Sequence, residues 1–127
     1  MWEDAEIISE YSRAQAIEDG VLVDVSTVAK EAGIKFPVAV TNGVWGECVE
    51  VPAGIIGQDE SGRLWDVLWL LWCAIKATPK GQDTIKFVVH VRKDNKERTP
   101  PLVKLWARCG PGDNGEPVIT VMLEGED

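Results

Sequence analysis

The sequence is poor in the residues that most often mark a catalytic, metal or disulfide site. It has one histidine, His90, so any catalytic arrangement that depends on histidine would have to use that residue. No serine lies in a GxSxG elbow. The three cysteines are an odd number without CxxC spacing, which argues against a disulfide framework or a zinc site. We therefore expect no metal and no other cofactor, and a non-enzymatic role is favoured.

Long hydrophobic runs are also missing. The longest, from Val67 to Ile75, has nine residues, whereas a membrane-spanning helix needs about 20. The first residues, Met1-Trp2-Glu3-Asp4, have neither a basic region nor an apolar region of a secretory signal. These features predict a cytoplasmic protein.

Positive charge is scarce overall but is not evenly distributed. The chain has 13 basic and 21 acidic residues, for a formal charge of −8, which argues against a generic nucleic-acid binder. Residues 1–60 hold 12 acids and 3 bases, residues 76–108 hold 9 bases and 3 acids, and residues 109–127 hold five acids and no base. The distribution predicts a polarised molecule whose acidic surface meets another protein.

At 127 residues the chain is long enough for one domain, which we expect to span 1–127. Residues 1–11 are expected as a frayed arm and residues 124–127 as an acidic tail. Ser12 is a candidate cap for a short helix over 13–19, and a strand is predicted over 21–25. A second short helix is expected through residues 30–32, capped by Ser26 or Thr27 and closed by Gly33.

Residues 37–50 fit two structures. Pro37 suits the first position of a helix, and Val40, Val44, Cys48 and Val51 recur at helical spacing. The β-branched residues and the Asn42-Gly43 dipeptide would also suit a hairpin. The helix is favoured, because proline would cost a central strand a hydrogen bond.

The segment 63–77 is apolar on nearly every side of a predicted helix. Trp65, Trp69 and Trp72 are spaced to lie on one face of it. A helix that is apolar all round in a soluble chain has to be packed from more than one side. We therefore expect a buried, tryptophan-rich central helix.

Beyond residue 82 the pattern alternates with a period of two. Strands are predicted over 85–92, 102–109 and 118–123, which together form a three-stranded antiparallel meander. The predicted fold is therefore an α+β domain with N-terminal helices and a short strand, a central helix and a C-terminal meander. Gly110, Gly112 and Gly115 satisfy a GxGxxG string, but a strand follows them instead of a helix, so they predict a turn.

One face of the meander carries basic residues and a tryptophan. Lys86, His90 and Arg92 alternate on the first strand, and Lys104, Trp106 and Arg108 alternate on the next. A basic sheet face with an aromatic side chain can hold single-stranded nucleic acid. The single tryptophan and the overall charge make nucleic acid an unfavourable partner, with this face as its one candidate site.

The candidate ligand-binding residues are polar groups in apolar surroundings. Asp24 lies between two valines, and burying a carboxylate without a partner is costly. Asp66 lies one helical turn after Arg63, so an Arg63–Asp66 pair is the local explanation, and Arg13 or Arg63 could pair with Asp24. The candidates are Arg13, Asp24, Arg63, Trp65 and Asp66.

Two blocks of the sequence resemble a known family. They are Tyr11-x-Arg13-Ala-Gln-Ala-Ile17 with Asp19-Gly-Val-Leu-Val-Asp-Val25, and Ser61-Gly-Arg-Leu-Trp-Asp-Val-Leu68. They are similar to blocks in a family of small proteins of unknown function from bacteria, phages and plasmids. The resemblance covers about residues 7–75 and implies an accessory factor of a mobile element. The main hypothesis is a protein-interaction factor, and the alternative is a small-molecule-binding or enzymatic domain built on Arg63, Asp66 and Asp24.

Overall fold

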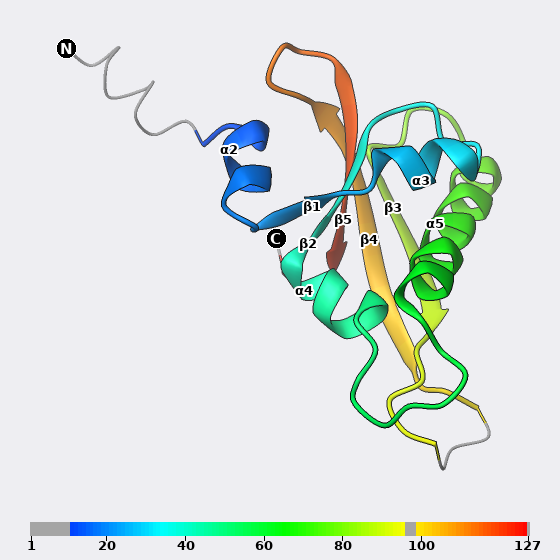
Figure 1. The fold of residues 1–127 in the computed structure, drawn as a ribbon. Helices are drawn as coiled ribbons and strands as arrows, with labels where there is room; N and C mark the ends of the chain where they lie inside the picture. The colour runs from blue at the N-terminus through cyan, green and yellow to red at the C-terminus, as the bar shows by residue number, and fades with distance from the viewer. Residues whose placement is uncertain (1–10, 96–98, 127) are drawn as a thin grey trace.

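A five-stranded mixed β-sheet forms the centre of the molecule (Figure 1). The computed structural model describes residues 11–95 and 99–126. The strands are β1 (Leu22–Asp24), β2 (Val38–Thr41), β3 (Thr84–His90), β4 (Leu102–Pro111) and β5 (Pro117–Leu123), and their order in the sheet is β1-β2-β5-β4-β3. Strands β2 and β5 are parallel, and every other neighbouring pair is antiparallel.

The predicted α+β class and the C-terminal meander β3-β4-β5 are confirmed. The sheet is larger than the meander, because β2 pairs with β5 and carries β1 on its outer side. The glycine-rich segment after β4 is a turn, as predicted, with Gly115 at a φ of +80° and the Gly112 amide donating to the Glu116 carbonyl.

The helix prediction for residues 37–50 is wrong in its first part. Residues 38–41 form β2, whose Val38 and Val40 side chains are fully buried. Pro37 lies just before the strand, where its missing N–H is harmless, and its carbonyl accepts a hydrogen bond from Ile119. The Asn42-Gly43 dipeptide makes no hairpin. It begins α4 (Asn42–Val44), which Thr41 caps and which continues into the π-helical turn η1 (Trp45–Val49).

Side chains cap two of the other helices, as predicted for Ser12 but not for Asp59. Ser12 accepts a hydrogen bond from the Gln15 amide at the start of α2 (Arg13–Glu18), and Asp59 accepts one from Gly62 at the start of α5 (Glu60–Ala77). The prediction that Ser26 or Thr27 caps the second helix is wrong, because α3 (Ser26–Glu31) has Val25 at the cap position and no side-chain cap. The Ser26 hydroxyl instead accepts from the Val38 amide and donates to Asp24.

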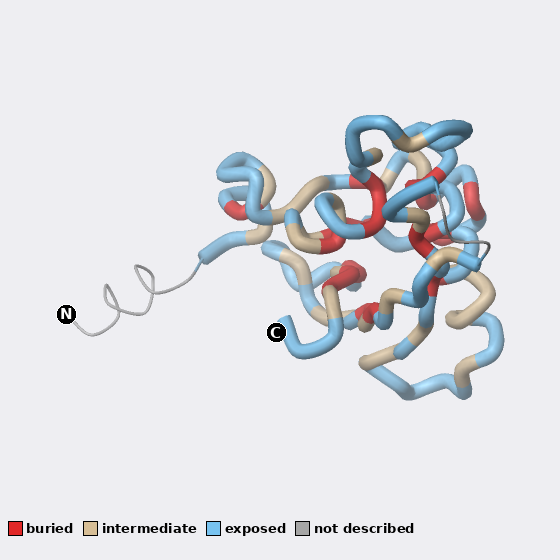
Figure 2. Tube along the Cα trace, turned by 90° about the horizontal axis from the view of Figure 1, so that it is seen from below, coloured by how far each residue is buried: buried red, intermediate tan, exposed pale blue. Residues whose placement is uncertain are grey.

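The hydrophobic core lies between one face of the sheet and the layer formed by α3, η1 and α5 (Figure 1). Leu68 and Leu71 of α5 meet Leu105 of β4 there, and all three side chains are fully buried. Figure 2 shows the buried segments gathered inside the body of the molecule, whereas α2 lies at its side and buries only Ala16. The opposite face of the sheet, called here the open face, is not covered by α3 or α5.

The helix α5 exists as predicted, but it is packed mainly on one side. Its buried side chains are Arg63, Leu64, Val67, Leu68 and Leu71. Trp65, Trp69 and Leu70 on its outer side are 39%, 44% and 36% exposed. Trp72 turns toward the end of α3, where Gly33 has a φ of +105° and a Cβ atom would lie 2.8 Å from the indole nitrogen. The expectation of a helix surrounded on all sides is therefore wrong, because one outer face of α5 is left to solvent.

Candidate functional site

Four side chains of β3 and β4 form a compact basic patch on the open face. They are Lys86, Lys104, Trp106 and Arg108, and we call them the basic face. Strand alternation puts them opposite the buried Leu105 and Ala107, and the strand register places Lys86 directly across from Trp106. The Lys86 Nζ atom lies 5.0 Å from the Trp106 ring centroid, and the Arg108 guanidinium carbon lies 5.9 Å from it. Two cations thus contact one indole ring, a geometry that favours cation–π attraction.

The basic face gathers three exposed cations on two neighbouring strands. The side chains of β3, β4 and β5 that point to this side, all of them in described strands, include no aspartate and no glutamate. Exposed apolar surface accompanies the charge, because Val88 on the same side of β3 is 46% exposed. The Trp106 indole N–H is buried and has no acceptor within the described residues. Because neighbouring atoms shield it, it is not itself a contact point for a partner.

A cleft continues the basic face toward α2. It has a volume of about 750 Å³, and the residues that bound it include Arg108, Met122 and Thr120 of the sheet and Tyr11 and Arg13 from the N-terminal side. Its lining is mostly apolar and includes three charged side chains, Arg13, Arg108 and Asp113. Arg108 belongs to both the cleft and the basic face, so the two form one continuous surface.

Polar contacts to β5 and to the β4–β5 turn hold α2 at this cleft. The Arg13 guanidinium donates to the Thr120 hydroxyl and to the Ile119 carbonyl, at 2.7 Å each. The Asp113 carboxylate accepts from the backbone amides of Arg13 and Ala14, at 2.7 and 3.0 Å. These two backbone hydrogen bonds lower the pKa of Asp113 below its usual range, because they favour the ionised form.

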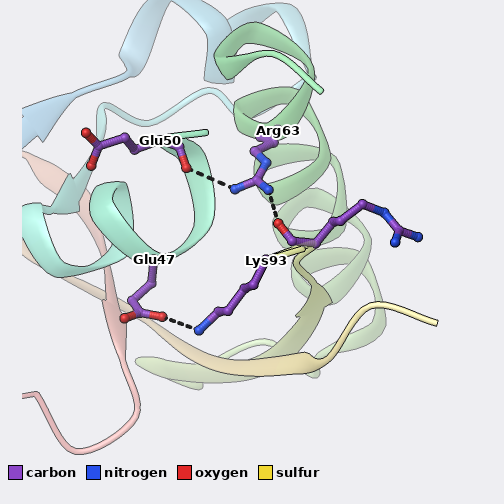
Figure 3. Close-up of polar contacts among 5 residues, drawn as sticks. Glu47, Glu50, Arg63 and Lys93 are labelled. Atoms are coloured by element: carbon purple, nitrogen blue, oxygen red, sulfur yellow. Dashed lines mark hydrogen bonds and ion pairs between the residues drawn. The ribbon is translucent and has the colours of Figure 1, made fainter. Parts of the chain in front are cut away.

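The other charged cluster of the fold, around Arg63, is a structural clamp (Figure 3). Arg63 on α5 is only 6% exposed. Its guanidinium donates to the Gln58 side chain at 3.1 Å, to the Glu50 carbonyl at 3.0 Å and to the Arg92 carbonyl. One side chain therefore fastens α5 to the loop after η1 and to the end of β3.

Beside this clamp an ion pair joins η1 to the chain that follows β3. The Lys93 Nζ atom lies 2.7 Å from a Glu47 carboxylate oxygen, and both side chains are about half exposed (Figure 3). A cavity of only about 20 Å³ remains nearby, lined in part by Cys48, Asp66 and His90. That volume fits at most one water molecule, so the cluster is too closed to bind a substrate.

The reactivity of the Cys48 thiol is a measure of how far solvent reaches this region. Burial raises the pKa of its thiol to about 11, so at pH 8 only about one molecule in 1,000 carries the reactive thiolate. We expect Ellman's reagent to label Cys73 and Cys109, which are partly buried, well before Cys48 in the folded protein. The rate at Cys48 should rise with pH, and all three thiols should react in denaturant. The Cys48→Ala variant is the control, since it should lose only the slow phase; loss of a fast phase would contradict the prediction.

The part of the chain that the structure describes holds no cluster of three or more metal-binding side chains. None of its helices combines the length and apolarity needed to cross a membrane.

Comparison with known proteins places the chain in a family. The family model described as Family of unknown function (DUF6573) matches residues 1–127. The chain belongs to this family. Searches of the curated proteins and of the solved structures gave no match.

In this DUF6573 chain the five candidate residues predicted from the sequence do not meet at one site. Arg13 and Asp24 both line a shallow cavity beside the β4–β5 turn. Arg63, Trp65 and Asp66 all belong to α5, but Arg63 points into the fold and Trp65 is exposed. Within the described residues Arg63 forms no ion pair with Asp66, since neutral oxygens take up its guanidinium.

Asp24 is exposed, contrary to the burial expected from its valine neighbours. Its carboxylate accepts hydrogen bonds from the Ser26 amide and hydroxyl at 3.0 and 2.6 Å, which shapes the turn into α3. The pattern of Val23 and Val25 predicted a buried strand, but β1 is an edge strand with one side open. Asp24 is therefore explained by local structure.

The basic face was visible in the sequence as an alternating pattern, apart from Arg92. That residue lies beyond the end of β3 at His90, so it is not part of the strand face. The cleft beside α2 had no sequence signal, because it depends on a contact between residues about 100 positions apart.

Proposed function

We propose that this DUF6573 protein is a non-enzymatic interaction factor that binds an acidic segment of another protein on the basic face. The observation that carries the proposal is the pair of cations, Lys86 and Arg108, that contact Trp106 on an open sheet surface. The resemblance of its sequence blocks to proteins from phages and plasmids supports a role as an accessory factor of a bacterial mobile element.

The chemistry of the basic face suits carboxylates combined with apolar side chains. Lys86, Lys104 and Arg108 are exposed cations within one strand pair, so a segment with several acidic residues could meet all three. Val88 and the indole of Trp106 offer apolar area between them, and tryptophan and arginine are enriched among residues that dominate binding energy. An extended acidic segment with apolar residues between its carboxylates matches this surface in both respects.

The acidic residues of the N-terminal half are more widely spread over the surface than the cations of the basic face. The eight acidic residues between positions 11 and 60 are all exposed, but they lie on α2, β1, α3, η1 and the start of α5. Several have local partners, such as Asp19 with Tyr11 and Glu47 with Lys93. For this reason we place the partner on the basic face instead of on the acidic N-terminal half.

Nucleic acid is the weaker candidate for the same face. Only one aromatic ring is present there, and two cations of the protein already lie against it, whereas single-strand binders usually stack successive bases on several rings. The remaining surface is acidic, with a net charge of −8 for the whole chain, and would repel a long polyanion beyond the three cations.

The test is the binding of a fluorescent peptide of alternating glutamate and valine. Binding is measured by fluorescence anisotropy at low and at high salt. We expect binding that weakens as salt rises, because screening acts on exposed charges. A triple variant, Lys86→Gln, Lys104→Gln and Arg108→Gln, should weaken it at least about tenfold, since each lost ion pair contributes up to about 1 kcal/mol.

The matched control removes the same number of charges elsewhere. Lys30, Lys35 and Lys80 are exposed lysines outside β3 and β4, and their replacement by glutamine should leave peptide binding almost unchanged. Equal losses in both triple variants would show a non-specific charge effect and overturn the proposal. A short oligothymidine that binds more tightly than the peptide, and is lost only in the basic-face variant, would identify a nucleic-acid site instead.

A further inference from the structure

A ladder of three stacked tryptophans runs along the outer side of α5. The ring centroids of Trp65 and Trp69 are 6.5 Å apart and those of Trp69 and Trp72 are 5.0 Å apart, with interplanar angles of 14° and 19°. Trp65 and Trp69 remain 39% and 44% exposed, and the neighbouring Leu70 is 36% exposed. The stacking fixes the rings in place, so a partner that docked here would order few additional side chains.

Such a surface is unusual on a protein that acts alone. Monomeric soluble proteins rarely expose contiguous aromatic area without a function, and tryptophan is enriched at the centres of protein interfaces. The ladder lies on the outer side of α5, whereas the basic face lies on the opposite side of the sheet, so a partner at one would leave the other free.

The charges beside the ladder indicate what covers it. Asp66 lies on the exposed side near the start of α5, and Lys76 lies on it near the end, with its Nζ atom 5.7 Å from the centroid of Trp72. Ten residues separate the two in sequence, which is about 15 Å along a helix. An acid at one end of a stripe and a base at the other make the stripe complementary to its own antiparallel copy.

We propose that α5 pairs with α5 of a second copy of this chain in an antiparallel, two-fold symmetric dimer. With the symmetry axis near Leu71, residues equally far before and after that position face each other. Asp66 then lies opposite Lys76 of the other copy. Trp69 lies opposite Cys73, and Trp65 lies opposite Ala77, so each large ring meets a small side chain. The dimer presents two basic faces, one on each copy.

The oligomeric state of the full chain is the first test, measured by sedimentation velocity from low to high micromolar concentration. We expect a concentration-dependent species of twice the monomer mass. The Trp69→Glu variant should weaken the dimerisation constant at least about tenfold, as is usual for an interface hot spot. Its helical content, measured by far-ultraviolet circular dichroism, should stay close to that of the wild type, because the Trp69 side chain is not part of the buried core.

A charge exchange tests the register. Asp66→Lys alone should weaken the dimer, since it places like charges together, and the double variant Asp66→Lys with Lys76→Asp should restore it. Carbodiimide coupling should join Asp66 to Lys76 only between copies, because the two are too far apart within one helix. A chain that stays monomeric throughout, a dimer indifferent to Trp69→Glu, or a double variant that is not restored would each overturn the proposal.

Discussion

Replacing Arg63 with methionine should destabilise the fold by about 2–5 kcal/mol, because it leaves buried hydrogen-bond acceptors without their donor. Arg63 is 6% exposed, and its guanidinium donates to three oxygens from three different segments. Methionine fills a similar volume but donates no hydrogen bond, so the carbonyls of Glu50 and Arg92 would be left without this donor. Each buried group left unpaired costs about 1–3 kcal/mol.

A lysine at this position separates charge from geometry. Arg63→Lys keeps the positive charge, but one ammonium group cannot reach all three acceptors in the directions that a planar guanidinium does. We expect its unfolding free energy to lie between those of the wild type and the methionine variant. A lysine variant as stable as the wild type would mean that charge alone matters at this site.

The neighbouring ion pair supplies the control. Lys93→Ala removes a contact of 2.7 Å, but Lys93 and Glu47 are about half exposed, and exposed pairs contribute about 0–1 kcal/mol. Urea unfolding of the three variants, followed by tryptophan fluorescence, would measure the ranking. A cost for Lys93→Ala equal to that for Arg63→Met would contradict the assignment of Arg63 as the clamp.

Local signals in the sequence predicted the parts of the fold that depend on local physics. Ser12 was predicted as a cap, Gly33 as the end of the second helix and the alternation beyond residue 82 as a meander, and each is present. All of these depend on interactions between residues close in sequence. The meander is the largest such unit, because each of its strands pairs with the strand next to it in the chain.

The strand β2 could not be predicted in the same way. Its pairing with β5 joins Val38 to Ile119 across about 80 residues, and no local pattern carries that information. The valines at 38 and 40 suited both helix and strand, and only the sheet edge offered by β5 decides between them. The position of α2, and with it the cleft, depends on other non-local contacts, from Arg13 to Thr120 and Asp113.

The candidate site shows a similar limit. The sequence identified Arg63 as a candidate polar residue, and the structure buries it. The carboxylates offered as its partners, Asp66 nearby in the helix and Asp24 farther along the chain, are not its hydrogen-bond acceptors. Its acceptors are carbonyl groups of Glu50 and Arg92, whose positions depend on how the loops fold. Every residue has a backbone carbonyl, so no pattern of residue types can predict which carbonyls will accept these hydrogen bonds.

The second large effect is expected at the inner face of α5, where Leu68→Ala should cost about 3 kcal/mol. The Leu68 side chain is fully buried between α5 and the sheet. Leucine-to-alanine changes at such sites cost about 2–5 kcal/mol, because they lose buried apolar area and leave a cavity. The same core holds Leu71 and Leu105, both fully buried, so little room exists for the site to collapse.

The same substitution two residues later is the matched control for how α5 is packed. Leu70→Ala removes the same atoms from the same helix, but Leu70 is 36% exposed, so it should cost less than about 1 kcal/mol. The composition of α5 alone suggests a helix packed on all sides. In such a helix, Leu68→Ala and Leu70→Ala would lower the free energy of unfolding by similar amounts. The free energy of unfolding of both variants, measured at equilibrium and at low protein concentration, therefore distinguishes a helix packed on one side from one packed on all sides. A difference of about 2 kcal/mol would establish that the apolar residues of α5 serve two purposes, with Leu68 stabilising the core and the exposed side left for a partner.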